Sequence, residues 1–93
     1  MSAVTAAQLQ MWADSAREIR NGWGCVWIAD AWRVARLHGS ELTLDEFKAA
    51  IAADAGCRAC LKRLDLAGAF PAAQQSESET SYMTASWHLV RRA

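Results

Sequence analysis

Apolar residues recur every three or four positions along two segments in the first part of the chain, residues 5–21 and residues 25–38. This spacing matches one face of an α-helix, so the pattern predicts two amphipathic helices. Gly22 and Gly39 directly follow the two segments and are typical of helix ends. The first helix also has a start signal, because Thr5 and Gln8 form a capping-box pattern.

A third helix is predicted after residue 43, where the local start signal is clearest. Thr43 and Glu46 have the spacing of a capping box, in which each side chain bonds the backbone N–H of the other residue. Leu42 and Phe47 flank this box as a hydrophobic staple. The pattern therefore predicts a helix that begins at residue 44 and ends at a turn over residues 54–56.

A fourth helix is predicted over residues 57–67, directly after Gly56. Its apolar arc would be formed by Cys57, Cys60, Leu61, Leu64, Ala67 and Gly68. Its exposed arc would carry three cations, Arg58, Lys62 and Arg63. Two helices joined by a tight turn that contains glycine, with a basic outer face on the second, are typical of a helix-turn-helix.

Residues 40–42, between the second and third predicted helices, indicate a short extended link. The C-terminal part has a different pattern. Residues 72–78 indicate a polar turn, and β-forming residues dominate from residue 79 onward. We expect a hairpin with strands at residues 79–83 and 87–91 and a turn at residues 84–86. The fold class is therefore expected to be mainly α with a small β-hairpin, that is, α+β.

This order of helix, link, helix, turn, helix and hairpin resembles the winged helix-turn-helix family, common among bacterial transcription regulators. The resemblance covers residues 25–92, with residues 5–21 as an accessory N-terminal helix of a single domain spanning residues 1–93. It implies that helix 57–67 enters the major groove of double-stranded DNA as the recognition helix and that the hairpin contacts the DNA backbone or the minor groove. The DNA contacts it implies are Arg58, Lys62, Arg63, Arg91 and Arg92, because arginine and lysine bind phosphates and arginine also reads guanine.

Charge and composition narrow the possible roles. The chain has 10 basic and 10 acidic residues, so its net charge of zero argues against indiscriminate binding to polyanions but is compatible with a local basic face. No apolar run approaches the roughly 20 residues that cross a bilayer, so no membrane partner is expected. Three cysteines, an odd number, and a start without an apolar leader favour a reduced, cytoplasmic setting.

Five tryptophans are a high count for 93 residues. Trp27 and Trp32 fit the core, and Trp12 fits the seam between the first helix and the rest of the domain. Trp23 and Trp87 are expected to expose a face, and exposed aromatic residues favour contact with a partner. Trp12, Trp23 and Trp87 are therefore the candidate partner-binding residues, and the first helix is a candidate homodimer contact.

The cysteines and histidines are better interpreted as structural residues than as catalytic or metal-binding ones. Cys57 and Cys60 form a CxxC pattern that would make a four-ligand zinc set with Cys25 and His88, but both lie on the apolar arc of their helix. His38 and His88 are interpreted as structural, and no spacing indicates a nucleophile with its base or a phosphate loop. We therefore expect a non-enzymatic protein without a metal or cofactor.

Two functions remain open: a DNA-binding regulator or accessory factor, and a winged-helix adaptor, assembly subunit or inhibitory protein that binds another protein. If DNA is the partner, affinity falls steeply between roughly 50 and 200 mM salt, and Ala substitutions of Arg58 and Lys62 lower it. If a protein is the partner, binding is indifferent to both substitutions and depends on Trp23 or Trp87. A salt series of duplex-DNA binding separates the two.

Overall fold

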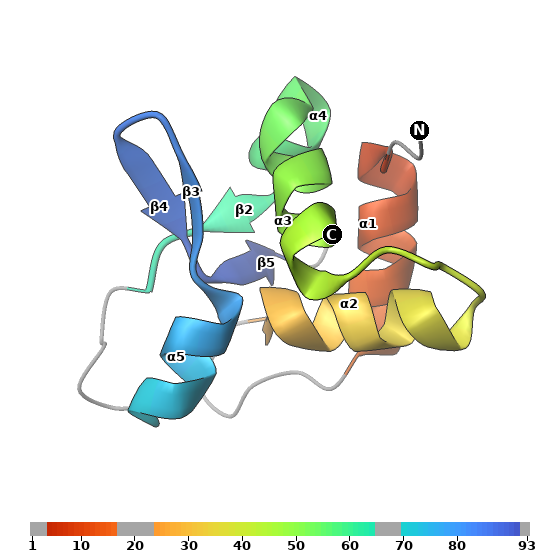
Figure 1. The fold of residues 1–93 in the computed structure, drawn as a ribbon, viewed down its shortest axis with the longest axis horizontal. Helices are drawn as coiled ribbons and strands as arrows, with labels where there is room; N and C mark the ends of the chain where they lie inside the picture. Colours follow the sequence, from red (N-terminus) through yellow and green to blue (C-terminus); the bar gives the residue numbers. More distant parts are fainter. Residues whose placement is uncertain (1–3, 17–23, 65–69, 92–93) are drawn as a thin grey trace.

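The computed structural model describes residues 4–16, 24–64 and 70–91, and these form an α+β domain of five helices and five short strands (Figure 1). This confirms the fold class expected from the sequence at its coarse level. In chain order the elements are α1 (Ala6–Ser15), β1 (Cys25–Trp27), α2 (Ile28–Leu37), α3 (Leu44–Ala53), α4 (Ala55–Arg58), β2 (Leu61–Lys62), α5 (Ala72–Ser78), β3 (Thr80–Tyr82), β4 (Ala85–Trp87) and β5 (Leu89–Arg91).

The last strand, β5, is the centre of the larger sheet. The strand order is β1–β5–β2, and both pairings are antiparallel. Val90 lies opposite Val26 on one side and opposite Leu61 on the other. The second sheet is the hairpin of β3 and β4, in which Ser81 lies opposite Ser86. Because β4 leads into β5 through His88 alone, the two sheets are joined at this residue.

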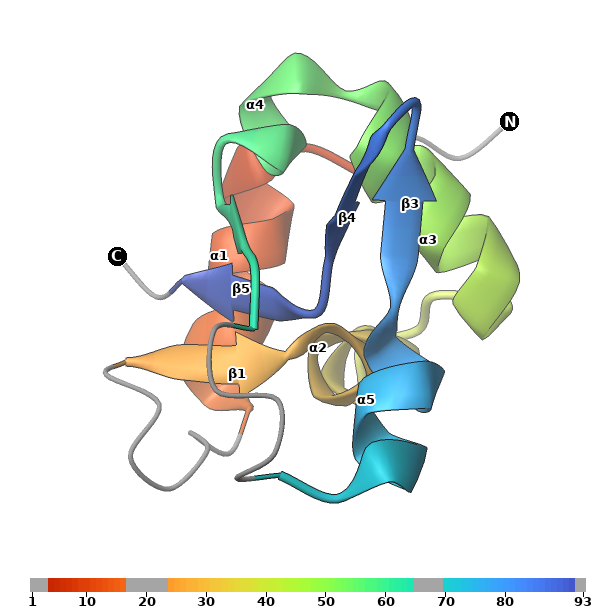
Figure 2. The same ribbon diagram turned by 90° about the vertical axis from the view of Figure 1, so that its left-hand side faces the viewer.

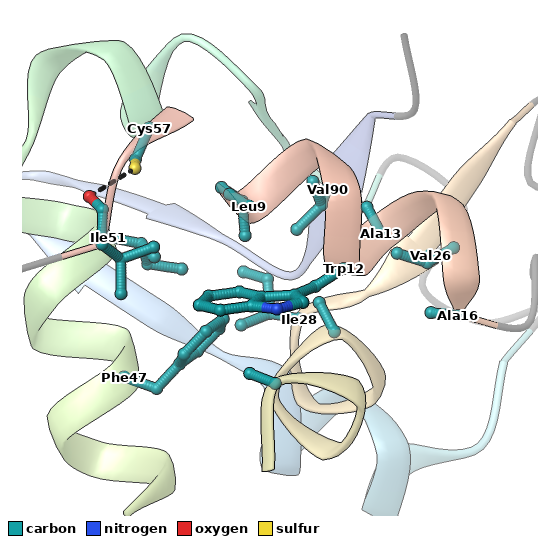
Figure 3. Packing of buried hydrophobic residues seen from close by; sticks show 13 residues of the cluster. Leu9, Trp12, Ala13, Ala16, Val26, Ile28, Phe47, Ile51, Cys57 and Val90 are labelled. Carbon is teal, nitrogen blue, oxygen red and sulfur yellow. Dashed lines mark hydrogen bonds between the residues drawn. The ribbon is translucent and has the colours of Figure 1, made fainter. Parts of the chain in front are cut away.

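The core lies between the three longer helices and the β5 strand (Figure 3). Trp12 of α1 contacts Phe47 of α3, with ring centroids 6.0 Å apart and planes tilted by 46°. Ile28 of α2 and Val90 of β5 are fully buried in the same cluster. Each of these elements therefore contributes apolar side chains to one shared interior. Among the described residues, no helix combines the length and the apolarity needed to cross a bilayer.

Two helix starts lie where the sequence predicts them. The Thr43 hydroxyl accepts from the Glu46 amide at 3.2 Å, and the Glu46 carboxylate accepts from the Thr43 amide at 2.9 Å. Thr5 and Gln8 form the same reciprocal pair at the start of α1. These hydrogen bonds confirm both capping boxes. The sequence predicts them because the bonded residues lie only three positions apart in the chain.

The predicted start of α2 is wrong. The helix was expected from residue 25, but residues 25–27 form β1 and the helix begins at Ile28. Distant groups bind the first amides of α2: the His88 carbonyl accepts from Ile28 N at 3.1 Å, and the Ser78 hydroxyl accepts from Ala29 N at 3.1 Å. This start is fixed by tertiary contacts, which a local pattern does not contain.

The predicted recognition helix over residues 57–67 is also wrong. Helix α4 ends at Arg58, and Leu61 and Lys62 form β2. The Arg91 amide donates to the Cys60 carbonyl at 2.8 Å, which extends the pairing of this segment with β5. Strand pairing therefore replaces the helical continuation. Residues 17–21 and 65–67 of the predicted helices lie outside the described residues.

The C-terminal expectations are confirmed in part. A hairpin is present, but its loop is Met83–Thr84 instead of residues 84–86. The expected return strand of residues 87–91 is divided, with β4 in the hairpin and β5 in the other sheet. The polar segment 72–78 is a helix, α5, and Glu77 on it pairs with Arg33 of α2 at 2.6 Å. Residues 40–42, expected as a short link, contain neither helix nor strand.

The cap that Ser78 provides to α2 predicts a stability effect. Replacing Ser78 with Ala leaves the buried Ala29 amide without its acceptor, so we expect the free energy of unfolding to fall by about 1–3 kcal/mol. Ser76→Ala is the matched control, because Ser76 lies on the same helix with an exposed side chain and is expected to change stability by less than about 0.5 kcal/mol. Urea unfolding followed by circular dichroism measures both. Equal losses in the two variants would contradict the distant cap.

Candidate functional site

The tip of the β3–β4 hairpin has an unusual combination of conformation and exposure. Tyr82 pairs with Ala85, so the loop contains only Met83 and Thr84. Met83 has φ 55°, and among the described residues no other non-glycine residue has a positive φ. A positive φ at the first residue of a two-residue loop is typical of a turn that prefers glycine there. The Met83 side chain is also 88% exposed.

Arg58 lies against the protein at the base of this tip. Its Nη1 donates to the Ala52 carbonyl at 2.5 Å, close to the C-terminal end of α3. Its guanidinium lies 4.4 Å from the centroid of the Tyr82 ring, a cation–π contact. Arg58 therefore ties the hairpin to the end of α3, and we call Arg58, Tyr82 and Met83 the tip surface.

The other predicted DNA-binding residues do not share a helical face. Lys62 is half-buried in β2, and Arg63 follows it with an exposed side chain. Arg91 is exposed at the end of β5 that pairs with Cys25, whereas Arg63 lies near the opposite end, beside His88. Arg92 lies outside the described residues. The structure therefore places Arg58, Arg63 and Arg91 in three different surroundings.

The tryptophans are mostly structural. Trp12 is 7% exposed within the core, which agrees with a seam between α1 and the rest of the domain but leaves little of its ring for a partner. Trp87 is half-buried against the same core. Trp27 is buried as predicted and meets Phe70 edge-on, whereas Trp32 is half-buried and donates its indole N–H to the Leu42 carbonyl. Trp23 lies outside the described residues.

Sequence reasoning missed Tyr82 and Met83 as surface residues. Both were assigned to a strand, since the expected turn began at residue 84. The signal that identifies them is the two-residue loop of the hairpin, and this depends on the pairing register of β3 and β4.

The cysteines have different surroundings. The Cys57 thiol is fully buried and donates to the Val4 carbonyl at 3.3 Å (Figure 3). Burial, followed by the nearby Asp54 carboxylate, raises the pKa of Cys57 to about 12. Cys60 is half-buried, and its thiol donates to the Gly56 carbonyl at 3.4 Å. In the described parts of the chain, no three His, Cys, Asp or Glu side chains are grouped to hold a metal ion.

Comparison of this chain with protein-family models, with curated proteins and with solved structures gives no match. What the chain binds must therefore be inferred from its own surface.

The pKa of Cys57 predicts a slow thiol reaction. Alkylation requires the thiolate, so we expect iodoacetamide at pH 8 to modify Cys57 at least about 100-fold more slowly in the folded protein than in urea. Trypsin cleaves after Arg58 and places Cys57 and Cys60 in separate peptides, so mass spectrometry reads each thiol independently. The raised pKa also predicts that the contribution of Cys57 to the free energy of unfolding is constant below about pH 9 and falls toward pH 12, because the unfolded chain loses this proton first. Equal alkylation rates with and without urea would contradict this assignment.

Proposed function

We propose that this chain is a non-enzymatic winged-helix module that binds a protein partner, and that it docks through the tip surface. The protein-binding function, which the sequence left open beside DNA binding, is better supported by the arrangement of the described residues. Three features support it: the order of the elements, the charge on the outward face of α3, and the exposed methionine.

The order of the helices and strands supports a winged-helix fold, but other elements take the roles that the sequence pattern predicts. Strand β1 lies between the first two helices, α2 and α3 follow as the helix pair, and β2 and β5 complete the order β1–β5–β2. In this alignment, α1 belongs to the core of the domain, and α3 takes the place of the recognition helix. The segment of β3, β4 and α5 becomes an insertion between the last two strands of the sheet.

The outward face of α3 does not suit DNA. Its exposed residues include Asp45, Glu46, Ala49 and Ala53. Two carboxylates at the start of the helix repel phosphates, and alanine provides no polar atom to read a base edge. Arg58 lies beyond the end of α3 and already stacks on Tyr82. These features favour a protein as the partner.

The observation that carries the proposal is the exposure of Met83 at a positive φ. A non-glycine residue at positive φ costs of order 1–3 kcal/mol, and such residues cluster where a site needs them. Methionine is flexible and polarisable, and it is enriched at protein interfaces. At this tip, the strained backbone holds an apolar side chain out in water, next to an aromatic ring fixed by Arg58. This arrangement suits insertion into an apolar pocket of the partner.

Replacing Met83 with Gly separates binding from folding. Glycine accepts the positive φ without strain, so we expect the variant to be at least as stable as the wild type in thermal unfolding. The variant also lacks the apolar anchor, so we expect partner affinity to fall at least 10-fold. Capture from extracts of the source cells, with the chain immobilised and bound proteins quantified by mass spectrometry, identifies proteins that the wild type retains and Met83→Gly does not.

Leu37→Ala is the matched control, because Leu37 is 86% exposed but lies on α2. A protein retained by the wild type and Leu37→Ala but lost with Met83→Gly supports the proposal. The same proteins captured by all three chains would contradict it. Tight binding of duplex DNA that weakens steeply with salt and with Arg58→Ala would overturn it in favour of DNA.

A further inference from the structure

The two sheets separate at His88 and leave a cleft between them. The His88 amide donates to the Lys62 carbonyl at 3.2 Å, which joins β2 to the residue that precedes β5. Before His88, the chain forms β4, whose strand partner among the described residues is β3. Figure 2 shows β2 and β4 on either side of the turn into β5. The cleft has a volume of about 240 Å³ and is lined by Arg63, Leu64, Thr84, Ser86 and His88.

The β3–β4 hairpin has two chemically different faces. Alternate residues of a strand point to opposite faces, so Thr84, Ser86 and His88 share one face, and Ser81 joins it as the partner of Ser86. The opposite face carries Trp87 against the core. The face toward the cleft is therefore rich in hydroxyl groups.

Arg63 provides the positive charge of this cleft. Its side chain is exposed, and it forms no ion pair or hydrogen bond within the parts of the chain that the structure describes. The described residues that line the cleft include no carboxylate. Glu79 lies 3.8 Å from Nε2 of His88, on the other side of the ring from the buried Nδ1. An arginine and two hydroxyl-bearing residues that line one cleft, with no acid among the described lining residues, suit an oxyanion.

We infer that this cleft binds the phosphate group of a phosphorylated serine or threonine on the partner protein. The inference rests on the proposed protein-binding function and names the chemistry recognised beside the tip surface. A phosphate has three terminal oxygens, which match the forked guanidinium of Arg63 together with the Thr84 and Ser86 hydroxyls better than the two oxygens of a carboxylate do. Leu64 forms the apolar wall of the same cleft and suits the carbon chain of the modified residue.

A small probe tests the cleft without the partner. N-acetyl-phosphoserine methylamide, titrated into the ¹⁵N-labelled full chain, is expected to shift the amide signals of Thr84, Ser86 and His88 saturably, with a Kd on the order of 1 mM. Arg63→Gln is expected to weaken this binding at least 10-fold, and Ser86→Ala about 3-fold. Arg91→Gln is the matched control, because Arg91 is an exposed arginine at the far end of β5 and is expected to leave the Kd unchanged.

The outcomes distinguish this inference from the proposed function. Loss of binding in Arg63→Gln with retention in Arg91→Gln supports the cleft, whatever the capture experiment finds. No saturable shift up to about 50 mM probe, or equal binding by wild type and Arg63→Gln, would overturn it. Tighter binding of inorganic phosphate or of N-acetyl-glutamate methylamide than of the phosphoserine probe would overturn the assignment to a phosphorylated side chain.

Discussion

The pairing of β5 on both of its edges is the constraint on which the rest of this structure depends. It joins a segment near residue 26, a segment near residue 61 and the C-terminal residues in one sheet. The backbone N–H and C=O groups of a buried strand need partners, and β5 obtains them from β1 and β2. Val90, in the middle of this strand, is fully buried against the residues of α1, α2 and α3. The helices therefore pack on a sheet that forms only when the end of the chain returns to its middle.

The same constraint produces the candidate surfaces. Because β5 must lie between β1 and β2, the preceding hairpin leaves the sheet at His88 and projects beside α3. One face of the hairpin packs Trp87 on the core and carries Tyr82 against Arg58, whereas the other faces the cleft beside Arg63. A basic segment that the sequence presents as one helical face is thus divided: Arg58 supports the tip, and Arg63 lines the cleft. The tip surface and the cleft therefore each contain one arginine of this segment.

Cysteine and tryptophan illustrate how burial decides the role of a reactive or aromatic residue. Cys57 and Cys60 have the spacing of a metal or redox motif, yet Cys57 is enclosed beneath Val4 and its raised pKa keeps it a thiol. Trp12, a candidate partner contact, has its ring against Phe47 in the interior. By contrast, Met83 is exposed at a strained position, and neither its residue type nor its neighbours in the sequence indicate this.

The sequence by itself determined the features that depend on residues a few positions apart. The capping boxes at Thr5 and Thr43, the helix starts that follow them and the presence of a C-terminal hairpin were predictable, because their hydrogen bonds and apolar spacing are local, whereas α1 ends at Ser15 instead of residue 21.

Only the tertiary structure decided where α2 begins, that residues 61–62 form a strand, and which residues stand at the hairpin tip. The partners that fix these features are distant in the chain: Ser78 for Ala29, Val90 for Leu61, and the register of β3 on β4 for Met83. Helical propensity is a difference of less than about 1 kcal/mol per residue, so at Leu61 and Lys62 pairing with a buried strand overrides it.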